Sequence, residues 1–205
     1  MKLGDEDHTP AVIETILVAY TLLDGRDDTR DKAEPLKSAV EDLQAKDLAL
    51  LWGRVERRAS TARIGWLDGV ADRAYMGCSR AVLHTVDNNR KHPTFKLLFP
   101  EAPSDTADPV GGDEQARDYQ LLIHLLRTEA AAEPFAAHAD TLEAALTALR
   151  AEEARRKQLD LEVAKLSAAR DASQAAAKAL YNGLPPHLQL QFPNDPKLVR
   201  ALLGG

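Results

Sequence analysis

Histidine, cysteine and acidic side chains are the groups of this chain that could bind a metal ion. No two histidines have the His-x3-His spacing, and none has the Glu-x2-His spacing that di-iron helical bundles use. A zinc site needs a cluster of cysteine and histidine ligands, and the chain has one cysteine. We therefore expect no metal and no other cofactor. The six histidines are His8, His84, His92, His124, His138 and His187.

Nucleophilic catalysis would need Cys78 beside a base. The nearest histidine, His84, is six residues away, and side chains on one helical face are three or four residues apart. The Gly-x-Ser-x-Gly, Gly-x-Gly-x2-Gly and phosphate-loop motifs are also absent. We expect Cys78 to be a buried structural thiol, and we expect the protein not to be an enzyme.

Two basic clusters in the first half of the chain could bind an anion or a nucleic acid. Glu56, Asp68 and Asp72 interleave with them, and the net charge is -6. This mixture is typical of solvated helix faces, so nucleic-acid binding ranks third among the functions considered. The cationic residues are Arg54, Arg57, Arg58, Arg63, Arg90, Lys91 and Lys96.

Four aromatic residues, Tyr20, Trp52, Trp66 and Tyr75, could line a pocket in a helical core. Ligand sites in helical bundles form between helices and are rich in apolar and aromatic side chains. A bundle that binds a small molecule or cofactor is therefore the second-ranked function.

The composition predicts which elements would position these side chains. The 205 residues include 34 Ala and 30 Leu but only 10 Val and 4 Ile. Ala and Leu favour helices, whereas β-branched residues favour strands, so an all-β or Rossmann fold is excluded. No run approaches the ~20 apolar residues of a membrane span. With an acidic N-terminus and a single cysteine, these features favour a cytoplasmic protein.

Residues 11–23 have apolar side chains on a wide face, which predicts a helix buried on more than one side. Residues 34–89 read as two antiparallel helices joined near Ser60-Thr61. A single helix of that length would be ~80 Å long and would need a partner of equal length. Residues 101–112 are rich in Pro, Gly, Ser and Asp and read as a linker or exposed loop, and helical signal resumes over 113–181.

An internal repeat relates the two sides of that linker. At an offset of 99 residues, Tyr-x-Leu-Leu and Ala-Glu-Pro recur, and at an offset of 93 the string Pro-x3-Leu-x-Phe-Pro-x2-Pro recurs. The repeat predicts an all-α bundle of two tandem, pseudo-symmetric units that share one core. Phe99 and Phe192 occupy equivalent positions, where we expect them to cover bundle ends as structural plugs. The boundaries are a flexible N-terminus at 1–9, a first repeat at 10–103, a linker at 104–112 and a second repeat at 113–205.

Duplicated helices without a catalytic constellation favour a non-enzymatic structural or interaction protein. We expect it to bind a protein partner or itself through helix surfaces, so a homo-oligomer is one of the expected forms. The Ala-rich stretches over 130–132 and 168–179 permit close helix approach and support this first-ranked function.

Overall fold

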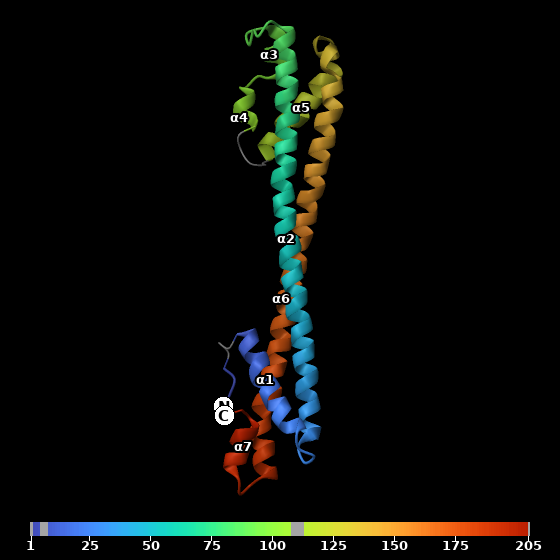
Figure 1. Ribbon diagram of the computed structural model, residues 1–205. Helices are drawn as coiled ribbons and strands as arrows, with labels where there is room; N and C mark the ends of the chain where they lie inside the picture. The colour runs from blue at the N-terminus through green and yellow to red at the C-terminus, as the bar shows by residue number, and fades with distance from the viewer. Residues whose placement is uncertain (1, 5–7, 108–112, 205) are drawn as a thin grey trace. The chain divides into compact units, whose positions relative to one another are not determined.

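The computed structural model describes residues 2–4, 8–107 and 113–204. In this part of the chain the structure is all-helical and has no strand, which confirms the all-α prediction (Figure 1). The elements are α1 (Thr9–Asp24), α2 (Arg30–Thr85), α3 (Pro93–Leu98), α4 (Pro103–Ala107), α5 (Asp113–Thr128), the 3-10 helix η1 (Ala130–Phe135), α6 (Ala137–Gln191) and α7 (Pro196–Leu202).

The chain divides into two compact units that do not follow the order of the sequence. Unit 1 comprises residues 1–55 and 160–205, and unit 2 comprises residues 56–159. Helices α2 and α6 each contribute one part to unit 1 and the other part to unit 2. Each unit therefore contains segments from both predicted repeats.

The core of unit 1 lies where α1, the first part of α2 and the last part of α6 meet, with α7 packed beside them (Figure 1). Buried residues recur every three or four positions on each helix, which is the spacing of one helical face. They include Val12, Ile16, Ala19 and Leu23 on α1, Ala33, Leu36, Val40 and Leu43 on α2, and Ala177, Tyr181, Leu184 and Leu188 on α6. Between α2 and α6, the Ser173 hydroxyl donates to the Asp42 carboxylate at 2.6 Å.

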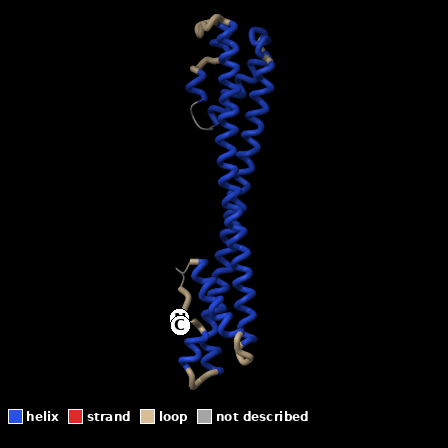
Figure 2. The backbone as a smooth tube through the Cα atoms, in the orientation of Figure 1, coloured by secondary structure: helices blue, strands red, loops and turns tan. Residues whose placement is uncertain are grey.

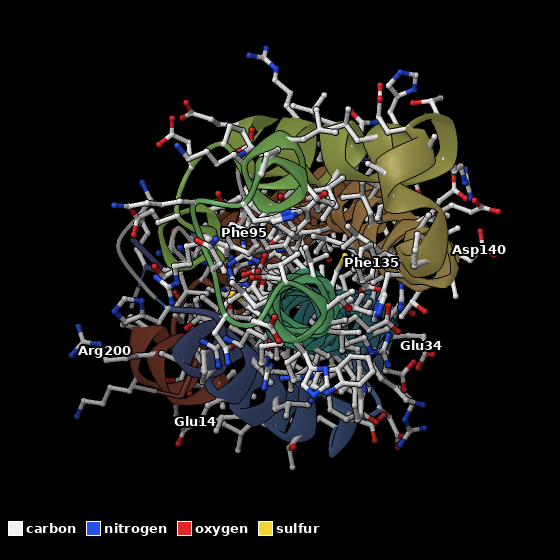
Figure 3. The ribbon with its side chains drawn as sticks, turned by 90° about the horizontal axis from the view of Figure 1, so that it is seen from above. Glu14, Glu34, Phe95, Phe135, Asp140 and Arg200 are labelled. Atoms are coloured by element: carbon white, nitrogen blue, oxygen red, sulfur yellow. The ribbon has the colours of Figure 1, made fainter. Side chains whose placement is uncertain are left out.

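The core of unit 2 is richer in aromatic rings. The ring of Tyr75 lies 4.8 Å from that of Tyr119 and 5.4 Å from that of Phe99, between centroids. Phe95 and Phe135 are also buried in this core, whereas Asp140 lies at its outer edge (Figure 3). The aromatic core joins α2, α3 and α5 to the start of α6.

Helix α2 runs without a break from Arg30 to Thr85, so the expected hairpin at Ser60-Thr61 was wrong (Figure 2). Polar residues alone do not end a helix, and no glycine or proline stands between residues 54 and 64. The Thr61 hydroxyl bonds to the carbonyl of Arg57 within the helix and accepts a bond of 2.9 Å from Arg156 Nε on α6. Helix α6 has 55 residues, so the chain contains a second helix of nearly the same length.

Prolines interrupt the helices less than the sequence suggests. Helix α6 continues through Pro185 and Pro186 to Gln191, ten residues beyond the predicted end of the helical signal at Tyr181. Leu184 and Leu188 are buried in the unit 1 core, and this packing offsets the backbone hydrogen bonds that the prolines cannot make. The predicted flexible N-terminus (1–9) and the predicted linker (104–112) also contain more ordered structure than expected.

At the N-terminus, expected to be flexible, Leu3 is buried, and its backbone N–H and C=O both bond to the Asn182 side chain, at 2.9 and 3.0 Å. Residues 103–107 form α4, with Pro103 and Thr106 buried, where we expected an exposed loop. Residues 1, 5–7 and 108–112, which complete these two predictions, lie outside the described residues.

Cys78 is fully buried in the unit 2 core, as predicted, and burial raises the pKa of its thiol to about 12. The thiolate is the reactive form of cysteine, so the native protein should not react with Ellman's reagent at pH 8 over minutes. One thiol per chain should titrate at once after unfolding in guanidinium chloride. Rapid reaction of the folded protein would contradict the buried position.

Candidate binding surfaces

Four large apolar side chains of α2 form an exposed row in unit 1, which we call the α2 stripe. Successive members are three, one and three residues apart, so they share one face of the helix. Leu48, Leu51, Trp52 and Val55 are 55, 56, 60 and 45% exposed. Their combined apolar surface is a feature of unit 1 that its own core does not explain.

The α2 stripe faces away from α6. A Cβ atom on Gly53 would lie 2.9 Å from Leu166 Cδ1 and 3.4 Å from Val163 Cγ2, so α6 approaches α2 closely on that side. Leu50 is buried on the same side. One face of this segment of α2 therefore packs on α6, and the opposite face exposes the stripe.

Two opposite charges border the α2 stripe on one edge. Asp47 and Arg54 directly precede Leu48 and Val55, and they are seven residues, or two helical turns, apart. No carboxylate or cation of the described residues forms an ion pair with either of them. One end of this edge therefore carries the unpaired negative charge of Asp47, and the other end carries the unpaired positive charge of Arg54.

Helix α1 carries a second apolar face. Leu17, Val18 and Leu22 are 36 to 43% exposed, whereas Ile16 and Leu23 are fully buried. The expectation that α1 is buried on more than one side was therefore wrong, because α2, α6 and α7 cover a single face.

Glu14 on α1 and Arg200 on α7 point outward from unit 1 (Figure 3).

The four aromatic residues predicted to line a pocket are divided between the units. Tyr20 and Trp52 belong to unit 1, and Trp66 and Tyr75 belong to unit 2. Trp66 is 64% exposed, and Trp52 belongs to the α2 stripe, so neither indole lies in a core. Tyr75 is buried in the unit 2 core, and Tyr20 is half-buried. Trp52 was predicted to line an interior pocket, but it lies on the surface.

The predicted basic clusters do not form one patch. Arg54 belongs to unit 1, and the others belong to unit 2. Within unit 2, Arg63 is 22 residues before the end of α2, which is about 33 Å along the helix axis, and Arg90 and Lys91 follow that end. Arg57 and Arg58 lie with Arg63 on α2, and Lys96, on α3, follows Arg90 and Lys91. The cations of unit 2 therefore form two separate groups.

The two predicted plugs both follow directly on the end of a helix. Phe99 is buried in the unit 2 core, and its backbone N–H donates to the Phe95 carbonyl at 2.8 Å. Phe192 is half-buried against the unit 1 core, with the Arg26 guanidinium 5.5 Å from its ring centroid. Both rings add to a core, and their role in covering a bundle end stays a prediction.

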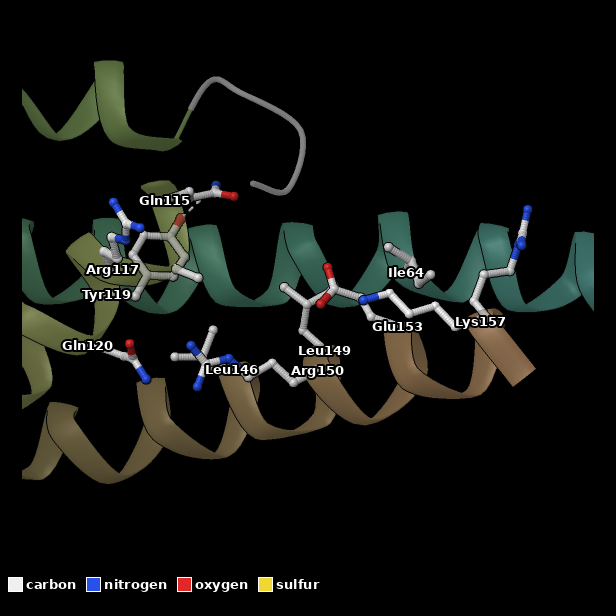
Figure 4. Close-up of a pocket in the computed structure, with 12 residues that line it drawn as sticks. Ile64, Gln115, Arg117, Tyr119, Gln120, Leu146, Leu149, Arg150, Glu153 and Lys157 are labelled. Atoms are coloured by element: carbon white, nitrogen blue, oxygen red, sulfur yellow. Dashed lines mark hydrogen bonds between the residues drawn. The ribbon is translucent and has the colours of Figure 1, made fainter. Parts of the chain in front are cut away.

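A pocket of about 690 Å³ lies in unit 2 between α2, the start of α5 and α6 (Figure 4). Among the described side chains, four cations line it, Arg117 from α5 and Arg150, Arg156 and Lys157 from α6, together with one carboxylate, that of Glu153. The sequence does not reveal this pocket. Residues 152–157 are of mixed charge, and Arg117, on a separate helix, is distant from them along the chain.

A hydrogen-bonded cluster fixes one wall of this pocket. Gln115 Nε2 donates to Asp72 at 2.9 Å and to the Tyr119 hydroxyl at 3.0 Å, and that hydroxyl also bonds to Asp72. Burial, followed by the bond to the Asp72 carboxylate, raises the pKa of Tyr119. The Tyr119 hydroxyl therefore stays protonated near neutral pH and acts as a fixed donor.

Within the described ranges, no group of three or more His, Cys, Asp or Glu side chains is arranged to hold a metal ion. Among the helices described, none combines the length and apolar character required to cross a membrane. Comparison of the chain with protein-family models, with curated proteins and with solved structures finds no match.

Proposed function

We propose that the protein is a non-enzymatic helical interaction protein that self-associates through the α2 stripe. The observation that carries this proposal is the exposed row Leu48, Leu51, Trp52 and Val55. Contiguous exposed apolar surface is rare on monomeric proteins and marks sites of association. Tryptophan, in particular, is enriched among residues that dominate binding energy.

A second copy of the chain is the partner that fits the α2 stripe best. A twofold interface places the same patch of both copies against itself, so the patch must complement itself. The α2 stripe is apolar along its length and meets this condition. In an antiparallel pair whose twofold axis passes midway between Asp47 and Arg54, about one residue from the middle of the stripe, the same edges face each other. Asp47 of one copy then meets Arg54 of the other at both ends.

The edge charges make the antiparallel arrangement testable. An Asp47→Arg variant would place cations opposite each other twice per dimer, and we expect dimer affinity to fall roughly tenfold, since each exposed pair contributes up to ~1 kcal/mol. The double variant Asp47→Arg/Arg54→Asp exchanges the charges and should restore the affinity. Sedimentation velocity measures both. A double variant as weak as the single one would exclude this pairing.

Cysteine cross-linking tests the surface directly. In a Leu51→Cys variant, the new thiols of two copies would lie near the twofold axis, and mild oxidation should give a covalent dimer. A Leu190→Cys variant is the matched control, because Leu190 is an 82% exposed leucine of α6 in the same unit. Cys78 stays unreacted because it is buried. Equal cross-linking of both variants, or of neither, would contradict the proposal.

We also retain the proposal that the chain is duplicated, and three features support it. Helices α1 and α5 have 16 residues each, and α2 and α6 have 56 and 55. Residues equivalent at the offset of 99 have similar burial, as in the pairs Leu23 and Leu122, and Leu43 and Leu142. Pro103 and Pro196, equivalent at the offset of 93, each begin a short helix.

A further inference from the structure

We propose that the basic pocket of unit 2 binds an organic phosphate, meaning a small molecule with a phosphate chain joined to an apolar or aromatic group. Nothing in the self-association proposal requires this pocket, since its lining residues all belong to unit 2 and the α2 stripe belongs to unit 1. The inference therefore stands or fails independently of the proposed function.

The size and walls of the pocket suit a small organic ligand. Its volume of about 690 Å³ is within the range of small-molecule sites. Ile64, Leu146 and Leu149 supply apolar wall, and the buried Tyr119 supports that wall, held in place by its bonds to Gln115 and Asp72. Such walls bind an apolar or aromatic group better than they bind an isolated inorganic ion.

The charge of the pocket favours an anion. Of its described side chains, four are cations and one is a carboxylate, although the whole chain carries a net charge of -6. Arginine binds phosphate oxygens with two parallel N–H donors, and lysine adds a compact charge. Figure 4 shows Arg150 and Lys157 extending along the pocket from α6, with Glu153 between them.

Most of these cations are available to a ligand. Within the described part of the chain, Arg117, Arg150 and Lys157 form no ion pair. In an adjoining groove, which shares Arg150 with the pocket, Arg127 is held by Asp140 at 2.8 Å and by Glu143 at 2.7 Å. Two carboxylates thus neutralise that arginine, whereas Arg117, Arg150 and Lys157 form no such pair with a described residue.

Isothermal titration calorimetry with ATP tests the inference on the full chain. We expect saturable binding of one ATP per chain that weakens as salt is added. The Arg150→Gln/Lys157→Gln variant should bind ATP at least tenfold more weakly, and Glu153→Gln should bind it severalfold more tightly, because a carboxylate that repels the phosphates is removed. A control variant, Arg90→Gln/Lys91→Gln, removes the same two charges at exposed positions of unit 2 outside the pocket and should bind within twofold of the unmodified chain.

Inorganic tripolyphosphate separates an organic phosphate from a bare phosphate chain, and we expect it to bind at least tenfold more weakly than ATP. Equal affinity for the two would overturn the organic part of the assignment. An absence of ATP binding at millimolar concentration, or equal losses in the pocket and control variants, would overturn the site. Circular dichroism melts of each variant ensure that a loss of binding is not a loss of folding.

Discussion

Replacing two residues of the α2 stripe with glutamate is expected to convert the dimer into a monomer. In the Leu51→Glu/Trp52→Glu variant, the twofold pairing would bring four carboxylates into an apolar contact. Truncating a central tryptophan costs roughly 2 kcal/mol or more, and the change occurs in both copies, so the dimer dissociation constant should rise at least about 1000-fold. Sedimentation velocity over a concentration series measures this change.

The fold of that variant should be unaffected, because both side chains are already exposed. Its far-ultraviolet circular dichroism should match that of the unmodified chain. A Leu190→Glu variant, which adds a charge at a more exposed leucine of the same unit, should dimerise normally. If both variants dimerise equally well, or if both lose the dimer, the α2 stripe is not the interface.

The second large effect is expected from two leucines of α2, one of which should determine stability and the other association. Leu43 is fully buried in unit 1, and Leu48, five residues later on α2, is 55% exposed. Leu43→Ala should lower the free energy of unfolding by about 2–5 kcal/mol, because it removes buried methyl groups and leaves a cavity. Leu48→Ala should leave the stability of the monomer within about 0.5 kcal/mol. Urea unfolding of both variants, at protein concentrations below the dimer dissociation constant, measures the two free energies of unfolding.

Association should respond in the opposite way. Leu48→Ala should weaken dimerisation, whereas Leu43→Ala should leave the affinity of the folded chains unchanged.

The proposed duplication adds a further expectation, because Leu142 is equivalent to Leu43 and also fully buried. Leu142→Ala should therefore cost about 2–5 kcal/mol as well. A large loss of stability in Leu48→Ala would place this residue in a core and contradict the exposed stripe.

Helix content was predictable here because Ala, Leu and their spacing determine local structure. The long helices were not, since whether a polar stretch such as residues 57–63 stays helical depends on what packs beside it. In α2, Thr61 is held by Arg156, 95 residues later. Pro185 and Pro186 stay within α6 for a similar reason, because Leu184 and Leu188 are anchored in the unit 1 core.

The binding surfaces were predictable only in part. The spacing of Leu48, Leu51, Trp52 and Val55 reveals a common face, but the sequence does not say whether that face meets a core or solvent. The basic pocket depends on bringing Arg117 of α5 beside Arg150 and Lys157 of α6. Charge runs along the chain do not identify such a group, since its members come from separate helices.

Sedimentation equilibrium of the unmodified chain tests self-association most directly. Measured from about 1 to about 200 µM, the average mass should rise with concentration from one chain mass of 22.4 kDa toward two. The Leu51→Glu/Trp52→Glu variant should stay at one chain mass throughout. A mass of 22.4 kDa for the unmodified chain at every concentration would contradict the proposal that the α2 stripe joins two copies.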